Sequence, residues 1–237
     1  MKRNSLGILA VLSSVILLTS CLNNNNNTTQ PQSGAFLVAQ VSPTAPANVG
    51  VYINNGLFDT MHFGVYTPYV TNVSPGTYSF MVDSFGSSTH ALTSNVTIEA
   101  KKNYSYFIID SFSKVKAAVT NDVIYIPSSD SSYVRFFNFC PNATEPLSLV
   151  ETTSGSALSA NRTFNDQQNN SQFVAFQEVP AGNYSFSLKT VSGTVLKTQN
   201  ITLTGGKVYT LYASGTIGNA DTTRAISIGK LENYPQR

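Results

Sequence analysis

The chain has 237 residues, only 11% of them charged, and it contains no tryptophan. Its 14 basic side chains exceed the 12 acidic ones only through Lys2 and Arg3, which belong to a predicted signal peptide, so the mature chain carries no net charge. Nucleic-acid binding relies on clustered Lys and Arg, and this balance therefore argues against a nucleic-acid partner. The length is enough for two domains of ordinary size.

Residues 1–20 have the pattern of a lipoprotein signal peptide. An apolar run over residues 6–18 follows the two basic residues, and it is shorter than the about 20 residues that a membrane-spanning helix needs. The run ends in the sequence LTSC at 18–21, which resembles the bacterial lipobox. The resemblance implies cleavage before Cys21 and lipid attachment to Cys21, and several acyl chains would form a stable membrane anchor. The alternative is an ordinary secretory peptide with an incidental cysteine.

Residues 21–34 are predicted to be a disordered tether. Five asparagines at 23–27 and the threonines after them are polar and uncharged, so this segment has little apolar surface to bury. Leu22, directly after Cys21, is not an acidic residue of the kind that acts as an inner-membrane retention signal. This favours the outer membrane as the site of the anchor. The sequence leaves open whether the folded part faces the cell surface or the periplasm.

The rest of the chain contains an internal repeat. The segment VSPGTYSF at 73–80 matches VPAGNYSF at 179–186, and NVTI at 95–98 matches NITL at 200–203. The spacing between matched segments grows along the chain, which places an insertion in the second copy within residues 156–172. This polar insertion is predicted to be a long loop. Two domains are therefore predicted, over 35–127 and 132–233.

Within each copy, apolar residues alternate with polar ones. Tyr78, Phe80 and Val82 alternate with Ser79 and Asp83, a pattern typical of a strand with one buried face and one face in solvent. The Asn-Gly pair at 55–56 predicts a hairpin turn in the segment 51–57. Each copy yields about seven short strands separated by turn signals. The predicted fold is all-β: two tandem immunoglobulin-like antiparallel β-sandwiches.

The first copy resembles the bacterial family known as domain of unknown function 4397. The resemblance rests on SPTAP at 42–46, VGVYIN at 49–54 and PGTY at 75–78. Gln40 and Gly50 stand where the family often has His and Asp, and in the second copy Asn138 and Cys140 replace the His and Ser. The resemblance covers about residues 36–126 and, more loosely, 133–231. It implies a β-sandwich in the cell envelope and brings no catalytic residue with it.

No residue pattern predicts an enzyme. His62 and His90 are the only histidines, neither lies in a catalytic motif, and the carboxylates are scattered. No catalytic residue, cofactor or metal ligand is therefore predicted, and Cys140 is interpreted as a buried apolar residue. Two alternatives stay open: a calcium site assembled from distant loops, and a hydrolase that uses one of the histidines.

The predicted function is that of a non-enzymatic cell-envelope lipoprotein whose two sandwiches act as binding or structural modules for an unidentified protein or glycan. The insertion at 156–172 is the first place to look for a contact, since loops commonly carry binding residues. The alternative is a carbohydrate-binding surface lipoprotein for glycan capture. Most aromatic residues are expected in the core, and the candidates for a sugar platform are Tyr66, Tyr69 and Tyr125.

Overall fold

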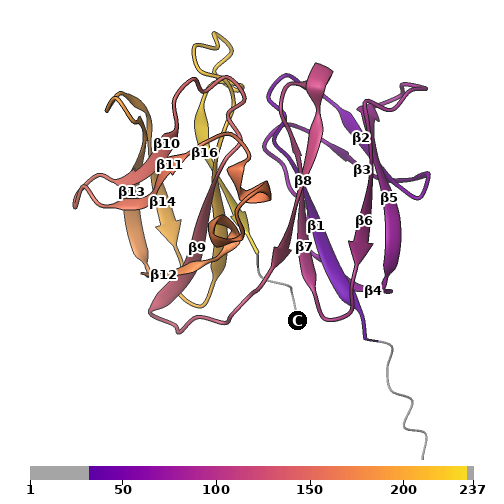
Figure 1. The fold of residues 1–237 in the computed structure, drawn as a ribbon, viewed down its shortest axis with the longest axis horizontal. Helices are drawn as coiled ribbons and strands as arrows, with labels where there is room; N and C mark the ends of the chain where they lie inside the picture. Colours follow the sequence, from indigo (N-terminus) through magenta and orange to yellow (C-terminus); the bar gives the residue numbers. More distant parts are fainter. Residues whose placement is uncertain (1–31, 234–237) are drawn as a thin grey trace, which may run out of the picture. The chain divides into compact units, whose positions relative to one another are not determined.

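The computed structural model describes residues 32–233 (Figure 1). The predicted signal peptide, Cys21 and most of the predicted tether lie outside these residues. The described part of the chain consists of strands, connecting loops and three short 3₁₀ helices. Within it, no helix is long and apolar enough to cross a bilayer.

The first repeat has eight strands in two four-stranded sheets. The sheet orders are β4-β1-β7-β8 and β3-β2-β5-β6, and all neighbours are antiparallel except β1 and β7, which run parallel. The helix η1 (Phe112–Lys114) connects β7 and β8. The strands are β1 (Gly34–Gln40), β2 (Val49–Ile53), β3 (Gly56–Met61), β4 (Val70–Val73), β5 (Gly76–Ser84), β6 (Leu92–Ile98), β7 (Asn103–Ile109) and β8 (Lys116–Asp122).

The second repeat has the same topology, strand for strand. Its sheets have the orders β12-β9-β15-β16 and β11-β10-β13-β14, again with one parallel pair, β9 and β15. The structure thus confirms the all-β sandwich prediction and adds one parallel pairing per repeat. The strands are β9 (Ser131–Asn138), β10 (Leu147–Glu151), β11 (Ala157–Arg162), β12 (Gln177–Pro180), β13 (Gly182–Thr190), β14 (Val195–Leu203), β15 (Val208–Ser214) and β16 (Ser227–Glu232).

Each sandwich encloses its own hydrophobic core, built from the alternation seen in the sequence. Phe80 and Val82 of β5 are fully buried in the first core, and Phe186 and Leu188 of β13 are buried in the second. Since a strand directs successive side chains to opposite faces, the period-two pattern was sufficient to identify the inward face of both strands.

The hairpin between β2 and β3 turns at Asn54 and Asn55, which both have positive φ, at 50° and 68°. Two positive φ values are typical of a type I′ turn, which matches the twist of the flanking strands. The turn therefore lies one residue earlier than the Asn-Gly pair suggested, and Gly56 is already the first residue of β3.

A third cluster of buried apolar residues is shared by the two repeats. Phe107 of β7 lies 5.8 Å from Phe137 of β9 and 5.0 Å from Phe139, measured between ring centroids. Leu37 of β1 and Tyr212 of β15 belong to the same cluster. The sheets β4-β1-β7-β8 and β12-β9-β15-β16 are thus buried on both faces, and both repeats belong to one compact unit.

The insertion of the second repeat is more ordered than the predicted loop. Its first part is the strand β11, the counterpart of β3, and its later part contains η2 (Asp166–Gln168) and η3 (Ser171–Val174). The spacing of equivalent strand starts rises from 98 residues (Val49 to Leu147) to 107 residues (Val70 to Gln177). The extra residues are divided between the β10–β11 hairpin and the segment 163–176, and only the segment 163–176 is called the insertion below.

Candidate functional site

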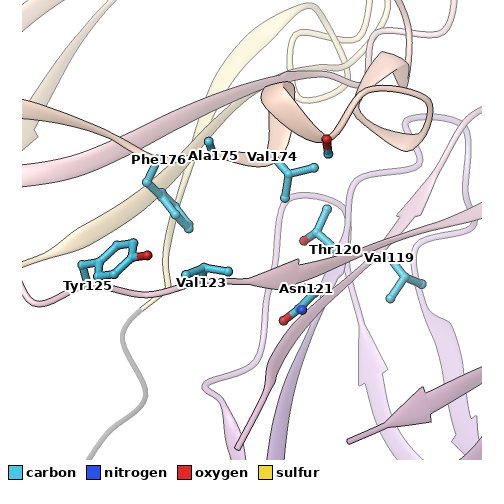
Figure 2. Close-up of a pocket in the computed structure, with 9 residues that line it drawn as sticks. Val119, Thr120, Asn121, Val123, Tyr125, Val174, Ala175 and Phe176 are labelled. Carbon is cyan, nitrogen blue, oxygen red and sulfur yellow. The ribbon is translucent and has the colours of Figure 1, made fainter.

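A hollow of about 500 Å³ lies between the end of the first repeat and the insertion (Figure 2). Ionisable groups are almost absent from its lining, with Tyr125 as the one exception, and most of the lining side chains are apolar. This composition suits binding of apolar surface rather than acid–base chemistry. The lining residues are Val119, Thr120, Asn121, Val123, Tyr125, Ser171, Val174, Ala175 and Phe176.

One wall of the hollow is formed by β8 and the residues after it. β8 is the last strand in its sheet, so one of its edges has no neighbouring strand in the described part of the chain. Beyond β8 the chain presents three strongly exposed apolar side chains, Val123 at 57%, Tyr125 at 63% and Ile126 at 60% exposure. Such a run on the surface of a sandwich is typical of an interaction site.

The insertion forms the opposite wall. Hydrogen bonds and ring contacts made by the insertion hold it in place. The side chain of Asn170 accepts a hydrogen bond from the backbone N–H of Gln172 at 3.0 Å and caps η3. The Gln168 amide donates to the backbone carbonyl of Val119 in β8 at 3.1 Å. The Phe176 ring packs against the Arg135 guanidinium at 4.2 Å. The insertion is therefore fixed to both repeats.

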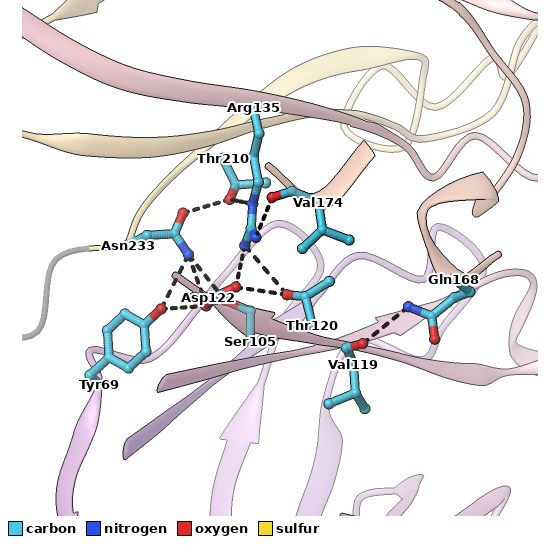
Figure 3. A network of polar contacts seen from close by, with 10 residues as sticks. All are labelled: Tyr69, Ser105, Val119, Thr120, Asp122, Arg135, Gln168, Val174, Thr210 and Asn233. Carbon is cyan, nitrogen blue, oxygen red and sulfur yellow. Dashed lines mark hydrogen bonds and ion pairs between the residues drawn. The ribbon is translucent and has the colours of Figure 1, made fainter. Parts of the chain in front are cut away.

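A buried polar network lies beside the hollow and joins the two repeats (Figure 3). Arg135 of β9 donates from Nη2 to Asp122 Oδ1 at 2.6 Å, and both side chains are at most 1% exposed. Arg135 also donates to Thr210 Oγ1 at 2.8 Å and to the backbone carbonyl of Val174 at 3.3 Å. The arginine thus bridges the first repeat, the second repeat and the insertion.

The Asp122 carboxylate has its hydrogen-bonding capacity filled. Besides Arg135, it accepts hydrogen bonds from the hydroxyls of Tyr69, Ser105 and Thr120 and from the side-chain amide of Asn233. Burial, and then the charge of Asp122, raise the pKa of Tyr69 well above its usual value. A fully satisfied pair of opposite charges has no free nucleophile or base, so this network serves structure rather than chemistry.

The three tyrosines predicted as a sugar platform have different surroundings. Tyr125 is exposed at the hollow. Tyr69 is buried at 8% exposure in the network, and Tyr66 packs partly buried against the shared cluster. The expectation of a surface position is therefore wrong for Tyr69, because its hydroxyl is needed by the buried carboxylate of Asp122.

The histidines and Cys140 do not form a catalytic arrangement. His62 Nδ1 lies 2.6 Å from the carbonyl of Ala47, and His90 Nδ1 lies 3.3 Å from Asp83. Cys140 is fully buried, as predicted, and its burial raises the pKa of its thiol to about 11. No group of three or more His, Cys, Asp and Glu residues gathers to hold a metal ion within residues 32–233.

Sequence reasoning missed the Asp122–Arg135 pair. One signal was present: Arg135 stands in the apolar run YVRFFNF at 133–139, and an arginine in a buried strand is almost always paired. Its partner lies across the linker between the repeats, so no periodic pattern connects the two residues.

A model of the family described as "Domain of unknown function (DUF4397)" matches residues 20–145, just over half of the chain. The chain belongs to this family. The DUF4397 match covers all strands of the first repeat and ends before β10, so the second repeat is related to it by the shared topology. The β8 wall of the hollow therefore lies within the DUF4397 match, and the insertion lies outside it. No curated protein matches the chain.

Two solved structures resemble this DUF4397 protein only distantly. CBMbc, a family CBM26 domain of Eubacterium rectale Amy13K solved in complex with maltoheptaose, is 14% identical with a TM-score of 0.25, over 86% of this chain and 97% of that chain. The Bacillus anthracis TIE protein is 10% identical with a TM-score of 0.24, over 85% of this chain and 44% of that chain. At these TM-scores neither likeness says what this chain binds.

Proposed function

We propose that this protein is a non-catalytic binding protein of the bacterial cell envelope, anchored to a membrane by lipid on Cys21, and that its partner occupies the hollow between β8 and the insertion. The observation that carries the proposal is the run of exposed apolar side chains Val123, Tyr125 and Ile126, of which Val123 and Tyr125 line the hollow. Binding of a partner would remove this apolar surface from water, at about 25 cal/mol per Å².

The free edge of β8 favours an extended segment of another protein as the partner. The backbone carbonyl of Val119 accepts a hydrogen bond from the Gln168 amide, so it points away from β7. Every second residue of β8, counted from Val119, has this parity and directs its backbone groups away from β7 in the same way. Asn121 has the same parity and lines the hollow. Because Gln168 already occupies the Val119 carbonyl, an added strand would pair with the backbone groups of Asn121 and place alternate side chains in the hollow.

Site-specific photo-crosslinking in intact cells tests this proposal. A photoreactive amino acid is introduced at Tyr125 and, as the matched control, at Val195, which is also strongly exposed but lies in β14 away from the hollow. We expect a protein adduct from position 125 and none from position 195. Identical adducts from both positions, or none from position 125, would count against the hollow as the binding site.

A glycan is the second candidate partner, and the exposed Tyr125 ring is the observation that favours it. Asn121 and Ser171 line the same hollow, and an apolar surface with a few placed polar groups is typical of small-ligand sites. A glycan array with the native protein and the Tyr125→Ala variant separates the candidates. Hits that disappear in the variant support a glycan, and an array without hits rejects it.

The membrane anchor has a separate test because Cys21 lies outside the described residues. With Cys21→Ser, the protein should move from the detergent phase to the aqueous phase in Triton X-114 partitioning, since the acyl chains supply the membrane affinity. We further propose the outer membrane as the anchoring membrane. Cell fractionation tests this location, and protease added to intact cells then shows whether the protein faces the exterior or the periplasm.

A further inference from the structure

A second polar site lies on the outer face of the sheet β3-β2-β5-β6. Asp83 of β5 belongs to the face that alternation assigned to solvent, opposite to the inward side chains of Phe80 and Val82. Instead, its side chain is only 1% exposed. Neither carboxylate oxygen has a hydrogen-bond partner within the described residues. Buried polar groups are almost always hydrogen-bonded, and a buried charge needs a partner of opposite sign.

The surroundings of Asp83 leave room for its carboxylate and place a nitrogen ligand at its mouth. Asp83 lies opposite Gly50 of β2, and a Cβ at position 50 would lie 2.6 Å from Asp83 Oδ1. His90, in the turn between β5 and β6, has a side chain that is 36% exposed, with Nδ1 3.3 Å from Asp83 Oδ2. The Tyr52 ring lies 5.5 Å from the His90 ring. The pKa of Tyr52 is raised by burial and then by the charge of Asp83.

The distance between the imidazole nitrogen and the carboxylate oxygen is informative. With His90 protonated the contact is an ion pair, but at 3.3 Å it is longer than the about 2.7–2.9 Å of a charge-assisted hydrogen bond and lacks hydrogen-bond geometry. Two ligands of one zinc ion, each about 2.0–2.1 Å from the metal at a tetrahedral angle, lie about 3.3–3.4 Å apart. The two atoms thus have the separation of neighbouring metal ligands.

We propose that Asp83 and His90 bind a divalent transition-metal ion such as Zn²⁺, with water completing its coordination. The ion would neutralise a buried carboxylate that faces the His90 imidazole at 3.3 Å and the Tyr52 hydroxyl without a hydrogen bond of ordinary geometry to either. An imidazole ligand selects zinc, copper or nickel over calcium and magnesium, which prefer oxygen ligands alone. With two protein ligands the site binds exchangeably rather than as a permanent structural centre.

The second repeat supplies an internal comparison. At the positions equivalent to Gly50 and Asp83 it has Ser148 and Lys189, given the spacing of the β2–β10 and β5–β13 pairs. A lysine cannot replace the carboxylate ligand, so the proposal assigns one ion per chain rather than one per repeat.

Isothermal titration of the full chain in detergent with ZnCl₂ tests the proposal, with the metal removed beforehand by a chelator. We expect one Zn²⁺ per chain, and at least tenfold weaker binding after His90→Ala. His62→Ala is the matched control, since His62 is an exposed histidine of the same repeat whose imidazole lies against the backbone carbonyl of Ala47. Its affinity should equal that of the native chain.

Asp83→Asn should also weaken zinc binding, and circular dichroism shows whether that variant is folded. Should it not fold, His90→Ala still decides, because the exposed His90 can be removed without opening the core. Binding that survives His90→Ala, binding that is lost with His62→Ala, or no zinc binding by the native chain at millimolar ZnCl₂ would each overturn the proposal.

Discussion

At the scale of single residues, the Asp122–Arg135 pair is expected to dominate the stability of the junction between the repeats. Asp122→Ala removes the charge that balances a guanidinium with 1% exposure. Breaking a buried ion pair by removing one partner costs about 3–5 kcal/mol, because the other charge stays buried and unpaired. Urea denaturation of the native and variant proteins should show a loss of stability in this range.

The exposed pair of Lys102 and Glu99 provides the control for this prediction. Its two side chains are 40% and 56% exposed, and exposed pairs contribute about 0–1 kcal/mol. Lys102→Ala should therefore change stability by less than about 1 kcal/mol. A similarly small change for Asp122→Ala would mean that the buried network does not join the repeats.

Cys140 gives a second prediction at this scale. Because burial raises the pKa of its thiol to about 11, the thiol stays protonated up to about pH 9 in the folded protein, and only the thiolate reacts. In the native chain, iodoacetamide should label Cys140 very slowly between pH 7 and 9, and rapidly once urea has unfolded the protein. Fast labelling of the folded protein would contradict both the burial and the pKa shift.

At the scale of elements, the insertion is expected to build the hollow and to strengthen the junction. The first repeat connects its equivalent strands β3 and β4 with residues 62–69 alone. Replacing the insertion by that shorter segment should leave the β-sheet circular dichroism spectrum unchanged. It should cost at least about 3 kcal/mol, because it removes Asp166, the ion-pair partner of Arg162, whose side chain is 3% exposed, and breaking a buried pair costs about 3–5 kcal/mol. The hydrogen bonds from Gln168 and to Val174 are lost as well. The crosslink from position 125 should disappear. Unchanged stability together with a retained crosslink would show that the insertion has neither role.

The strands were largely predictable at this scale, and the site was not. Alternation at 78–82 and 184–188 identified the buried faces because a strand's side-chain period is local. The 3₁₀ helices of the insertion depend on contacts with β8 and Arg135, which are distant in sequence, so a polar stretch was interpreted as a loop. Asp83 was placed in solvent for the same reason, since its burial under Tyr52 and His90 arises from neighbouring strands and turns.

At the scale of the whole molecule, the shared cluster decides how the two repeats unfold. Phe107 of the first repeat is fully buried against Phe137 and Phe139 of the second. Either repeat alone would expose these aromatic rings and the charged residue of the Asp122–Arg135 pair that it contributes. The segments 35–127 and 132–233, predicted as two domains, are therefore expected to depend on each other for stability.

Phe107→Ala tests this dependence, because it removes apolar contacts of the first repeat with the second. A fully buried Phe→Ala change costs about 3–5 kcal/mol. Cys140 lies in the second repeat. If the repeats unfold together, Cys140 should become reactive at a lower urea concentration in Phe107→Ala than in the native chain, by the shift that a stability loss of about 3–5 kcal/mol predicts. A tryptophan introduced at Tyr78 would report the first repeat, and its transition should coincide with that of Cys140. An unchanged Cys140 transition in Phe107→Ala would instead show that the second repeat unfolds independently, because its stability would then rest on its own core around Phe186 and Leu188.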